Sequence, residues 1–154
     1  MNFRIIESGD ITRCIWIRTS VRENRFSLEA LAKAGITEES VTKMLGTTHQ
    51  GWVCEVDGQL VGFSMGNKST GEFWVVAVLP EYEGQGIGRR LTELTQDWLW
   101  ASGCREIWLW TSVDTSTRAF ALYKKLGWMD YGIQNGRRIM KLQKSEASGV
   151  GGNA

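Results

Sequence analysis

Residues 78–89, Val-Leu-Pro-Glu-Tyr-Glu-Gly-Gln-Gly-Ile-Gly-Arg, constrain the fold more than any other stretch of this 154-residue chain. They join an apolar run to an amphipathic one through the only proline and three glycines at alternate positions. Proline has no N–H to donate to a strand ladder and favours an extended residue before it, so the apolar run is predicted to end at Leu79. The pattern therefore predicts a strand, a glycine loop and the start of a helix.

This strand–loop–helix unit favours an anion site. Without side chains on alternate residues, the N–H groups of residues 84–89 can point at one ligand, beside the unpaired donors and positive dipole end of a helix. Arg89 and Arg90 add positive charge. A dinucleotide fold would have its third glycine at position 89, and the Gly-Lys-Ser/Thr of a Walker loop is missing. A plain turn that uses glycine for backbone freedom is the alternative.

Hydrophobic periodicity divides the rest of the chain into strands and helices. Strands are predicted at residues 3–6, 51–56, 59–65, 72–78, 106–111, 128–134 and 137–142, with Asp57-Gly58 and Asn135-Gly136 as hairpin turns. Helices are predicted after a cap at Ser8 or Asp10, at 26–34, after Thr37, from the glycine loop to Gly103, and after a cap at Thr115 or Ser116.

The order of these elements predicts a mixed α/β fold. A full helix connects the strands at 72–78 and 106–111, so these two strands are expected to be parallel, in a right-handed crossover. Hairpin turns are expected to join most of the other strands. The expected fold is a mostly antiparallel sheet with one parallel pair and helices on both faces.

Composition narrows the functional classes. Eighteen basic and 17 acidic residues nearly balance, which gives no footprint for nucleic acid or an anionic membrane. No apolar run approaches the length of a membrane span, and a signal peptide is not recognised, so a cytoplasmic location is expected. One domain is expected over residues 1–144, followed by a small, polar, glycine-rich tail over 145–154.

The cysteines and the single histidine do not predict a metal centre. Cys14, Cys54 and Cys104 are widely spaced and are expected to be reduced thiols in a core. His49 lies in a polar stretch and is expected to be a surface or capping residue. We therefore predict no metal site.

Residues 78–88 resemble the acyl-CoA signature of the GNAT N-acetyltransferase superfamily, in which Val-x-Pro precedes the motif Gln/Arg-x-x-Gly-x-Gly/Ala. The motif's first position is Glu83 here, so a carboxylate replaces an amide or a base. The phosphates of the cofactor are held mainly by backbone N–H groups in that family. Glu83 leaves those groups intact, although its charge repels a polyanion.

A second motif comes at the expected distance. Residues 116–128 resemble the family's Asn-x-x-Ala-x-x-Leu-Tyr-x-x-x-Gly-Phe helix, with Ser116 in place of asparagine and Trp128 in place of phenylalanine. The resemblance covers residues 50–142 well and the first fifty in outline. It implies a GNAT-like sheet whose parallel strands splay apart, acetyl-CoA as co-substrate bound in the opening, and a homodimer by analogy.

The resemblance and the loop together give the predicted cofactor site. The backbone of the strand contacts the pantetheine arm and the thioester oxygen, the loop holds the diphosphate, and the second helix completes the site. The predicted cofactor-binding residues are Val76, Ala77, Val78, Glu83, Gly84, Gln85, Gly86, Ile87, Gly88, Arg89, Ser116, Ala119 and Tyr123. For Ser116, capping of its helix is the simpler interpretation.

Two residues are predicted to act in catalysis. The resemblance places Tyr123 near the sulfur of CoA, where its hydroxyl can protonate the leaving thiolate; packing of its ring between helix and sheet is the alternative. Glu72 begins the strand that reaches the acetyl site, where several relatives have a carboxylate base; an exposed charge at a strand end is the alternative. Weaker candidates are Glu55, Asp57, Glu106 and Asp130.

Eight tryptophans are many for this length, and some of them are candidates for an acceptor pocket or a dimer surface, although most are expected in the core. The leading hypothesis is transfer of an acetyl group from acetyl-CoA to a primary amine of a small molecule. Acetylation of a protein N-terminus or lysine is the second hypothesis. A non-catalytic acyl-CoA-binding module is the third. The sequence does not identify the acceptor.

Overall fold

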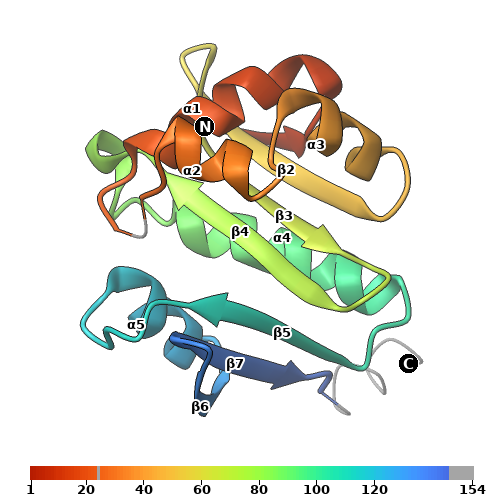
Figure 1. Ribbon diagram of the computed structural model, residues 1–154, viewed down its shortest axis with the longest axis vertical. Helices are drawn as coiled ribbons and strands as arrows, with labels where there is room; N and C mark the ends of the chain where they lie inside the picture. The colour runs from red at the N-terminus through yellow and green to blue at the C-terminus, as the bar shows by residue number, and fades with distance from the viewer. Residues whose placement is uncertain (24, 146–154) are drawn as a thin grey trace.

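The structure, a computed structural model, describes residues 1–23 and 25–145 and contains a seven-stranded sheet with helices on both faces (Figure 1). The strands are β1 (Asn2–Ile5), β2 (His49–Val56), β3 (Gln59–Asn67), β4 (Glu72–Val78), β5 (Glu106–Thr111), β6 (Met129–Gln134) and β7 (Arg137–Gln143). The α-helices are α1 (Ile11–Ser20), α2 (Leu28–Lys33), α3 (Glu38–Leu45), α4 (Ile87–Ala101) and α5 (Arg118–Lys125), with 3-10 turns η1 (Ser8–Asp10) and η2 (Pro80–Tyr82).

The predicted fold class is confirmed. The strand order is β1-β2-β3-β4-β5-β7-β6, and β4–β5 is parallel while the other neighbours are antiparallel. Both predicted hairpin turns are present: Asp57 and Gly58 have φ of 51° and 78°, and Asn135 and Gly136 have 53° and 76°. Two successive residues with positive φ match the right-handed twist of the strands that they join.

The parallel pair is held together only at its beginning. Glu72 and Trp108 form its one register pair, and the Trp108 N–H donates to the Gly71 carbonyl at 3.1 Å. Beyond this point β4 and β5 diverge toward their carboxyl ends (Figure 1). The sheet is therefore continuous at one end of this pair and open at the other.

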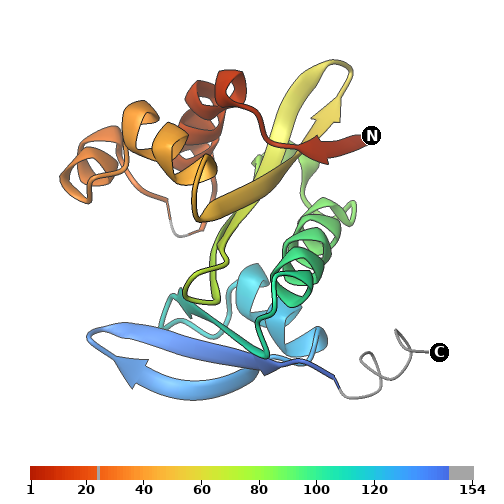
Figure 2. The ribbon, with the colours of Figure 1, turned by 90° about the vertical axis from the view of Figure 1, so that its right-hand side faces the viewer.

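Two hydrophobic clusters lie on either side of the divergence. Helices α1, α2 and α3 cover one face of the sheet and α4 covers the other (Figure 2). The first cluster joins α1, α3 and α4 to β2–β4 and includes Ile17, Val53 and Leu91, all fully buried. The second joins α5 to β5 and β7 around Trp128. Val76 in β4 packs against both clusters, so the open strand pair lies where the two clusters meet.

The cap of α5 was predicted one or two residues too early. Thr117 caps the helix, because its side-chain oxygen accepts a hydrogen bond from the Phe120 N–H at 3.2 Å. Ser116 instead donates both its N–H and its hydroxyl to the Asp114 carboxylate, at 2.9 and 2.6 Å. A turn centred on Asp114 has therefore recruited the hydroxyl that would have capped the helix, and Thr115 is not the cap either.

Asp10 precedes α1 as predicted but does not cap it with its side chain. Its carboxylate accepts from the Glu7 N–H at 2.8 Å and forms a forked pair with Arg4 at 2.8 and 2.9 Å. The caps expected at Thr37 and the stop expected at Gly103 are present, since Thr37 accepts from the Ser40 N–H and α4 ends at Ala101. The predicted tail lies, from residue 146, outside the described residues.

Within residues 1–23 and 25–145, each helix is too short or too polar to cross a lipid bilayer.

Candidate functional site

The glycine loop presents a row of unpaired backbone donors. Gly84 and Gly86 have φ of 78° and 82°, which L side chains rarely adopt, and Gly86 is the N-cap of α4. The first helical bond runs from the Arg90 N–H to the Gly86 carbonyl at 3.0 Å. Among the described residues, nothing accepts a hydrogen bond from the N–H groups of residues 84–89. This geometry is that of an anion cradle at a helix N-terminus.

A cavity of about 300 Å³ lies between β4, this loop and α5. Eleven of the predicted cofactor-binding residues line it: Val76, Ala77, Val78, Glu83, Gly84, Gly86, Ile87, Gly88, Arg89, Ala119 and Tyr123. Gln85 and Ser116 do not line it. We call this cavity the cofactor groove.

Glu83 brings two arginines to the cradle. Its carboxylate pairs with Arg22 at 3.2 Å and with Arg118 at 3.6 Å, and its side chain is only 19% exposed. The Arg118 guanidinium also lies 3.7 Å from where a Cβ on Gly84 would be. The backbone N–H of Arg118 donates to the Glu23 carboxylate at 2.9 Å. The sequence did not indicate these partners, because they come from segments far apart in the chain.

Tyr123 lies at the inner wall of the cofactor groove. Its side chain is 5% exposed, and its ring lies edge-on to Phe73, with centroids 6.2 Å apart. Burial raises the pKa of its hydroxyl, and the nearby positive charge of Arg18 opposes this shift. The hydroxyl is therefore protonated at neutral pH.

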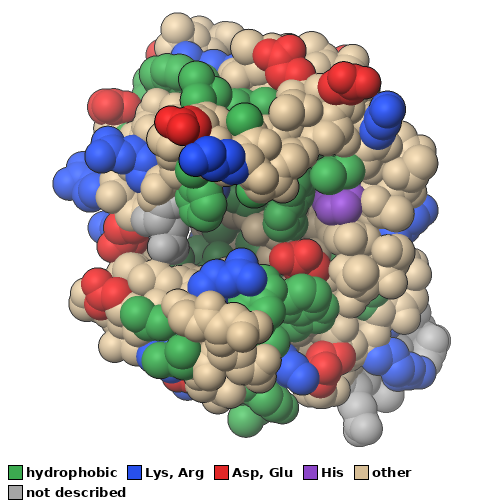
Figure 3. All heavy atoms as spheres, viewed as in Figure 1, with side chains coloured by type: hydrophobic (Ala, Val, Ile, Leu, Met, Phe, Trp, Pro, Cys, Tyr) green, Lys and Arg blue, Asp and Glu red, His purple; other side chains and the backbone are tan. Residues whose placement is uncertain are grey.

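A second cavity, of about 570 Å³, lies between the three N-terminal helices and the sheet. We call it the acceptor hollow. Aliphatic, aromatic and sulfur-containing side chains make up most of its wall, and its charged residues are Arg18, Glu72 and Arg137. In Figure 3, hydrophobic side chains gather around a recess between the upper and lower parts of the molecule, with charged side chains at its rim.

The two cavities meet at the divergence of β4 and β5. Five residues line both of them: Arg18, Trp74, Val75, Trp110 and Thr111. Trp74 and Trp110 belong to β4 and β5, respectively, so two of the eight tryptophans form the shared wall. A group held in the cofactor groove and a molecule in the acceptor hollow can therefore approach each other at this wall.

Glu72 lies in the wall of the acceptor hollow. Burial raises the pKa of its carboxyl, and the positive charge of Arg137 opposes this shift. Within the described chain, the carboxylate has no hydrogen-bond or ion-pair partner. A partly buried carboxylate without a partner can accept a proton more readily than one in an ion pair.

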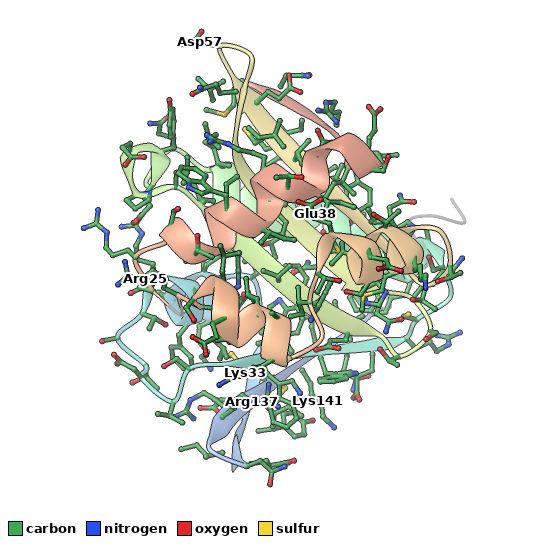
Figure 4. All side chains as sticks on the ribbon, turned by 45° about the horizontal axis from the view of Figure 1, so that its top comes forward. Arg25, Lys33, Glu38, Asp57, Arg137 and Lys141 are labelled. Atoms are coloured by element: carbon green, nitrogen blue, oxygen red, sulfur yellow. The ribbon has the colours of Figure 1, made fainter. Side chains whose placement is uncertain are left out.

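The weaker carboxylate candidates line neither cavity. Asp57 lies at the tip of the β2–β3 hairpin (Figure 4). The other three are paired elsewhere: Glu55 with Arg4 at 2.7 Å, Glu106 with Lys141 at 3.7 Å, and Asp130 with Arg138 at 2.6 Å.

His49 was expected to be a surface or capping residue, but it lies in a strand and is partly buried. It begins β2, its ring is half-buried edge-on against Trp74 with centroids 5.0 Å apart, and burial lowers its pKa. The cysteines are free thiols, as predicted, and Cys14 and Cys54 are buried. Burial raises the pKa of the Cys14 thiol to about 12, so this residue contributes packing to the wall of the acceptor hollow rather than a nucleophile.

A family model described as the acetyltransferase (GNAT) family matches residues 14–128. The chain belongs to the GNAT acetyltransferase family. Curated relatives of this GNAT chain include a mycothiol acetyltransferase from Arthrobacter sp. (strain FB24), 33% identical in an alignment 102 residues long that covers 56% of this chain and 31% of that protein. The N-alpha-acetyltransferase 30 of Schizosaccharomyces pombe is 36% identical over 66 residues, 43% of each chain.

Among solved structures, this GNAT chain resembles the PaiA N-acetyltransferase from Thermoplasma acidophilum, crystallised in complex with coenzyme A. The TM-score is 0.78 at 18% identity, over 93% of this chain and 99% of that one. The sequence matches are shorter, since the alignment spans about a third of the mycothiol acetyltransferase.

Proposed function

We propose that the protein is an acetyl-CoA-dependent N-acetyltransferase that acetylates a primary amine of a small molecule by direct attack in a ternary complex. One observation carries this proposal: a groove with an anion cradle and a hollow with an unpaired carboxylate meet at the open pair β4–β5. Family membership and the coenzyme A complex of a relative with the same fold support the cofactor.

The residues that line the cofactor groove fit a CoA thioester. The unpaired N–H groups of residues 84–89 would hold the diphosphate, with Arg22 and Arg118 nearby as counter-charges. Beyond Glu72, no described strand pairs with the edge of β4 that faces β5, so main-chain groups near Val76 are open to the pantetheine arm and the thioester oxygen. The bound thioester would supply the activated acetyl group.

The chemistry then needs one base and one acid. Glu72, directly or through a water, takes the proton that makes the acceptor amine neutral. The amine nitrogen forms a C–N bond to the carbonyl carbon, and the C–S bond breaks. Tyr123 gives a proton to the departing thiolate, and the second proton of the amine, lost as the amide forms, returns through water to the Tyr123 oxygen. Positioning at the shared wall lowers most of the barrier, because a neutral amine is already a good nucleophile.

Two measurements on the purified protein test this proposal. Calorimetry with acetyl-CoA should give micromolar or tighter binding, and a thiol-release assay should detect CoA when a panel of primary amines is added. Binding without CoA release from any amine or peptide would favour the non-catalytic module instead. Lack of binding at millimolar acetyl-CoA would contradict both.

Acetylation of a protein N-terminus is the second candidate, because one curated relative is named N-alpha-acetyltransferase 30. The acceptor panel should therefore include short peptides with a free N-terminus. Turnover that is faster with peptides than with every small amine would favour this alternative.

A further inference from the structure

The acceptor hollow differs from a polyamine site in its charge. A polyamine carries several ammonium groups and needs several carboxylates, whereas the hollow has one, Glu72, together with two arginines, Arg18 and Arg137. Its wall is otherwise almost wholly apolar, and apolar cavities exclude water and favour apolar occupants. The occupant that fits this wall has one amine and an apolar body.

Arg137 adds a requirement for a negative charge. Its guanidinium stacks on the Trp110 ring, with its centre 4.4 Å from the ring centroid. In the part of the chain that the structure describes, no side chain or carbonyl accepts a hydrogen bond from that guanidinium, and no carboxylate pairs with it. The residue projects from the start of β7 on the lower part of the molecule (Figure 4). A stacked guanidinium with unused donors is pre-organised for a carboxylate.

Glu72 and Arg137 line the same hollow, but they form no ion pair with each other. The two charges are close enough for Arg137 to lower the pKa of Glu72, yet neither side chain has a hydrogen-bond or ion-pair partner among the described residues. Two opposite charges that face one cavity without an ion pair leave room for a zwitterion between them, with its ammonium near Glu72 and its carboxylate near Arg137.

We infer that the acceptor is a free α-amino acid with an apolar or aromatic side chain, whose carboxylate binds Arg137 and whose side chain fills the hollow. This inference rests on the proposed function and narrows its substrate class. The amine of such a molecule would lie between Glu72 and the shared wall at Trp74, where the acetyl group is expected.

Steady-state CoA release with five acceptors tests the inference: phenylalanine, glycine, phenylalanine amide, phenethylamine and spermidine. Burial of the aromatic side chain should give phenylalanine about a 10- to 100-fold higher kcat/KM than glycine. Because of its carboxylate, phenylalanine should also have about a tenfold higher kcat/KM than phenethylamine and phenylalanine amide. A higher kcat/KM for spermidine, glycine or phenethylamine would overturn the inference and leave the proposed function intact.

Variants of Arg137 test the carboxylate contact. In Arg137→Gln the ratio of kcat/KM for phenylalanine to that for phenethylamine should fall toward one. Arg137→Lys should restore part of this ratio. Arg105→Gln is the matched control, because Arg105 is exposed and lines neither cavity. Acetyl-CoA affinity and circular dichroism should be unchanged in all three. An unchanged phenylalanine preference in Arg137→Gln would overturn the role of this residue.

A binding measurement separates this inference from the proposed function. Trp74 and Trp110 line the hollow, so phenylalanine added to the CoA-bound protein should change the tryptophan fluorescence with a saturable dependence on concentration. If no acceptor releases CoA, the proposed function fails, whereas this titration still tests the hollow. A titration without saturation below about 10 mM would overturn the inference, because an affinity that weak leaves less than about 3 kcal/mol of binding free energy.

Discussion

At the scale of single residues, burial shifts the pKa values of the two side chains proposed as acid and base, Tyr123 and Glu72. Tyr123 and Glu72 are both predicted from sequence, and each lines one of two adjoining cavities. Burial raises the pKa of both groups, which keeps the tyrosine hydroxyl protonated and makes the carboxylate a stronger base. Their positions are consistent with the acid and base of the proposed reaction.

Replacement of Tyr123 by phenylalanine removes the hydroxyl and keeps the ring that packs against Phe73 and Trp128. We expect kcat to fall by about 10²-fold or more, with the dissociation constant of acetyl-CoA changed less than about threefold. Stopped-flow CoA release and calorimetry measure the two quantities. Tyr131→Phe is the matched control, since Tyr131 is 49% exposed on β6. A kcat unchanged in Tyr123→Phe would assign Tyr123 to packing alone.

The stability of the Glu72→Gln variant should depend on pH. Because burial raises the pKa of this carboxyl, its contribution to folding is fully present below the unfolded-state pKa of about 4.3 and is lost as the pH rises through the folded-state pKa. The wild type should therefore lose stability relative to the variant as the pH rises above about 4.3. Calorimetric Tm values of both proteins from pH 4 to 8 test this. A constant Tm difference would contradict it.

Glu83 offers a test of charge at the cradle. Its carboxylate shares the positive charges of Arg22 and Arg118, so Glu83→Gln should leave both arginines free for a polyanion. We expect acetyl-CoA to bind about 3- to 10-fold more tightly at low ionic strength, with the gain shrinking as salt is added. Titration calorimetry at two salt concentrations measures this. Weaker binding would mean that Glu83 mainly positions the arginines.

At the scale of helices and strands, most of the fold could be predicted from local sequence. Hydrophobic periodicity identified β4, β5 and α4, and turn residues identified the hairpins at Asp57-Gly58 and Asn135-Gly136. Both signals depend only on residues close together in the chain. The cap of α5 was not, because Asp114 recruits Ser116. The ion pairs of Glu83 and the stacking of Arg137 on Trp110 also escaped prediction, since each depends on residues distant in sequence.

The close approach of β2 to β3 requires a glycine at position 51. A Cβ on Gly51 would lie 2.1 Å from the Ser64 carbonyl oxygen, closer than real atoms approach. Gly51→Ala should therefore destabilise the protein by about 1–3 kcal/mol or more. Gly9→Ala is the control, because a Cβ there would meet nothing within 4 Å, and it should change stability by less than about 0.5 kcal/mol. Urea denaturation of both variants measures the difference, and equal midpoints would contradict the clash.

At the scale of the whole molecule, two hydrophobic clusters face each other across an open strand pair. A ligand that contacts β4, the glycine loop and α5 would add contacts between parts that the sheet joins only at Glu72 and Trp108. Binding to the native state alone stabilises it by about 2.7 kcal/mol at a concentration 100 times the dissociation constant.

We therefore expect acetyl-CoA at that concentration to raise Tm by about 5–10 °C, from the usual 2–4 °C per kcal/mol for a chain of this size. Differential scanning calorimetry with and without the ligand measures the shift. Adenosine at equal concentration is the control, because it lacks the diphosphate that the cradle would hold. A shift of equal size with adenosine would contradict the role of the cradle.

The strand–loop–helix unit, the hairpins, the sheet class and the family could all be inferred from the chain alone, because each depends on short-range hydrophobic periodicity, turn residues or a motif of fixed spacing. Which charged side chains face the two cavities became visible only in the folded molecule. Arg22, Glu83 and Arg118 meet at the loop, and Glu72 and Arg137 face one hollow without pairing. The physical reason is that burial and charge pairing depend on distance in space, which packing sets between segments with no fixed relation along the chain.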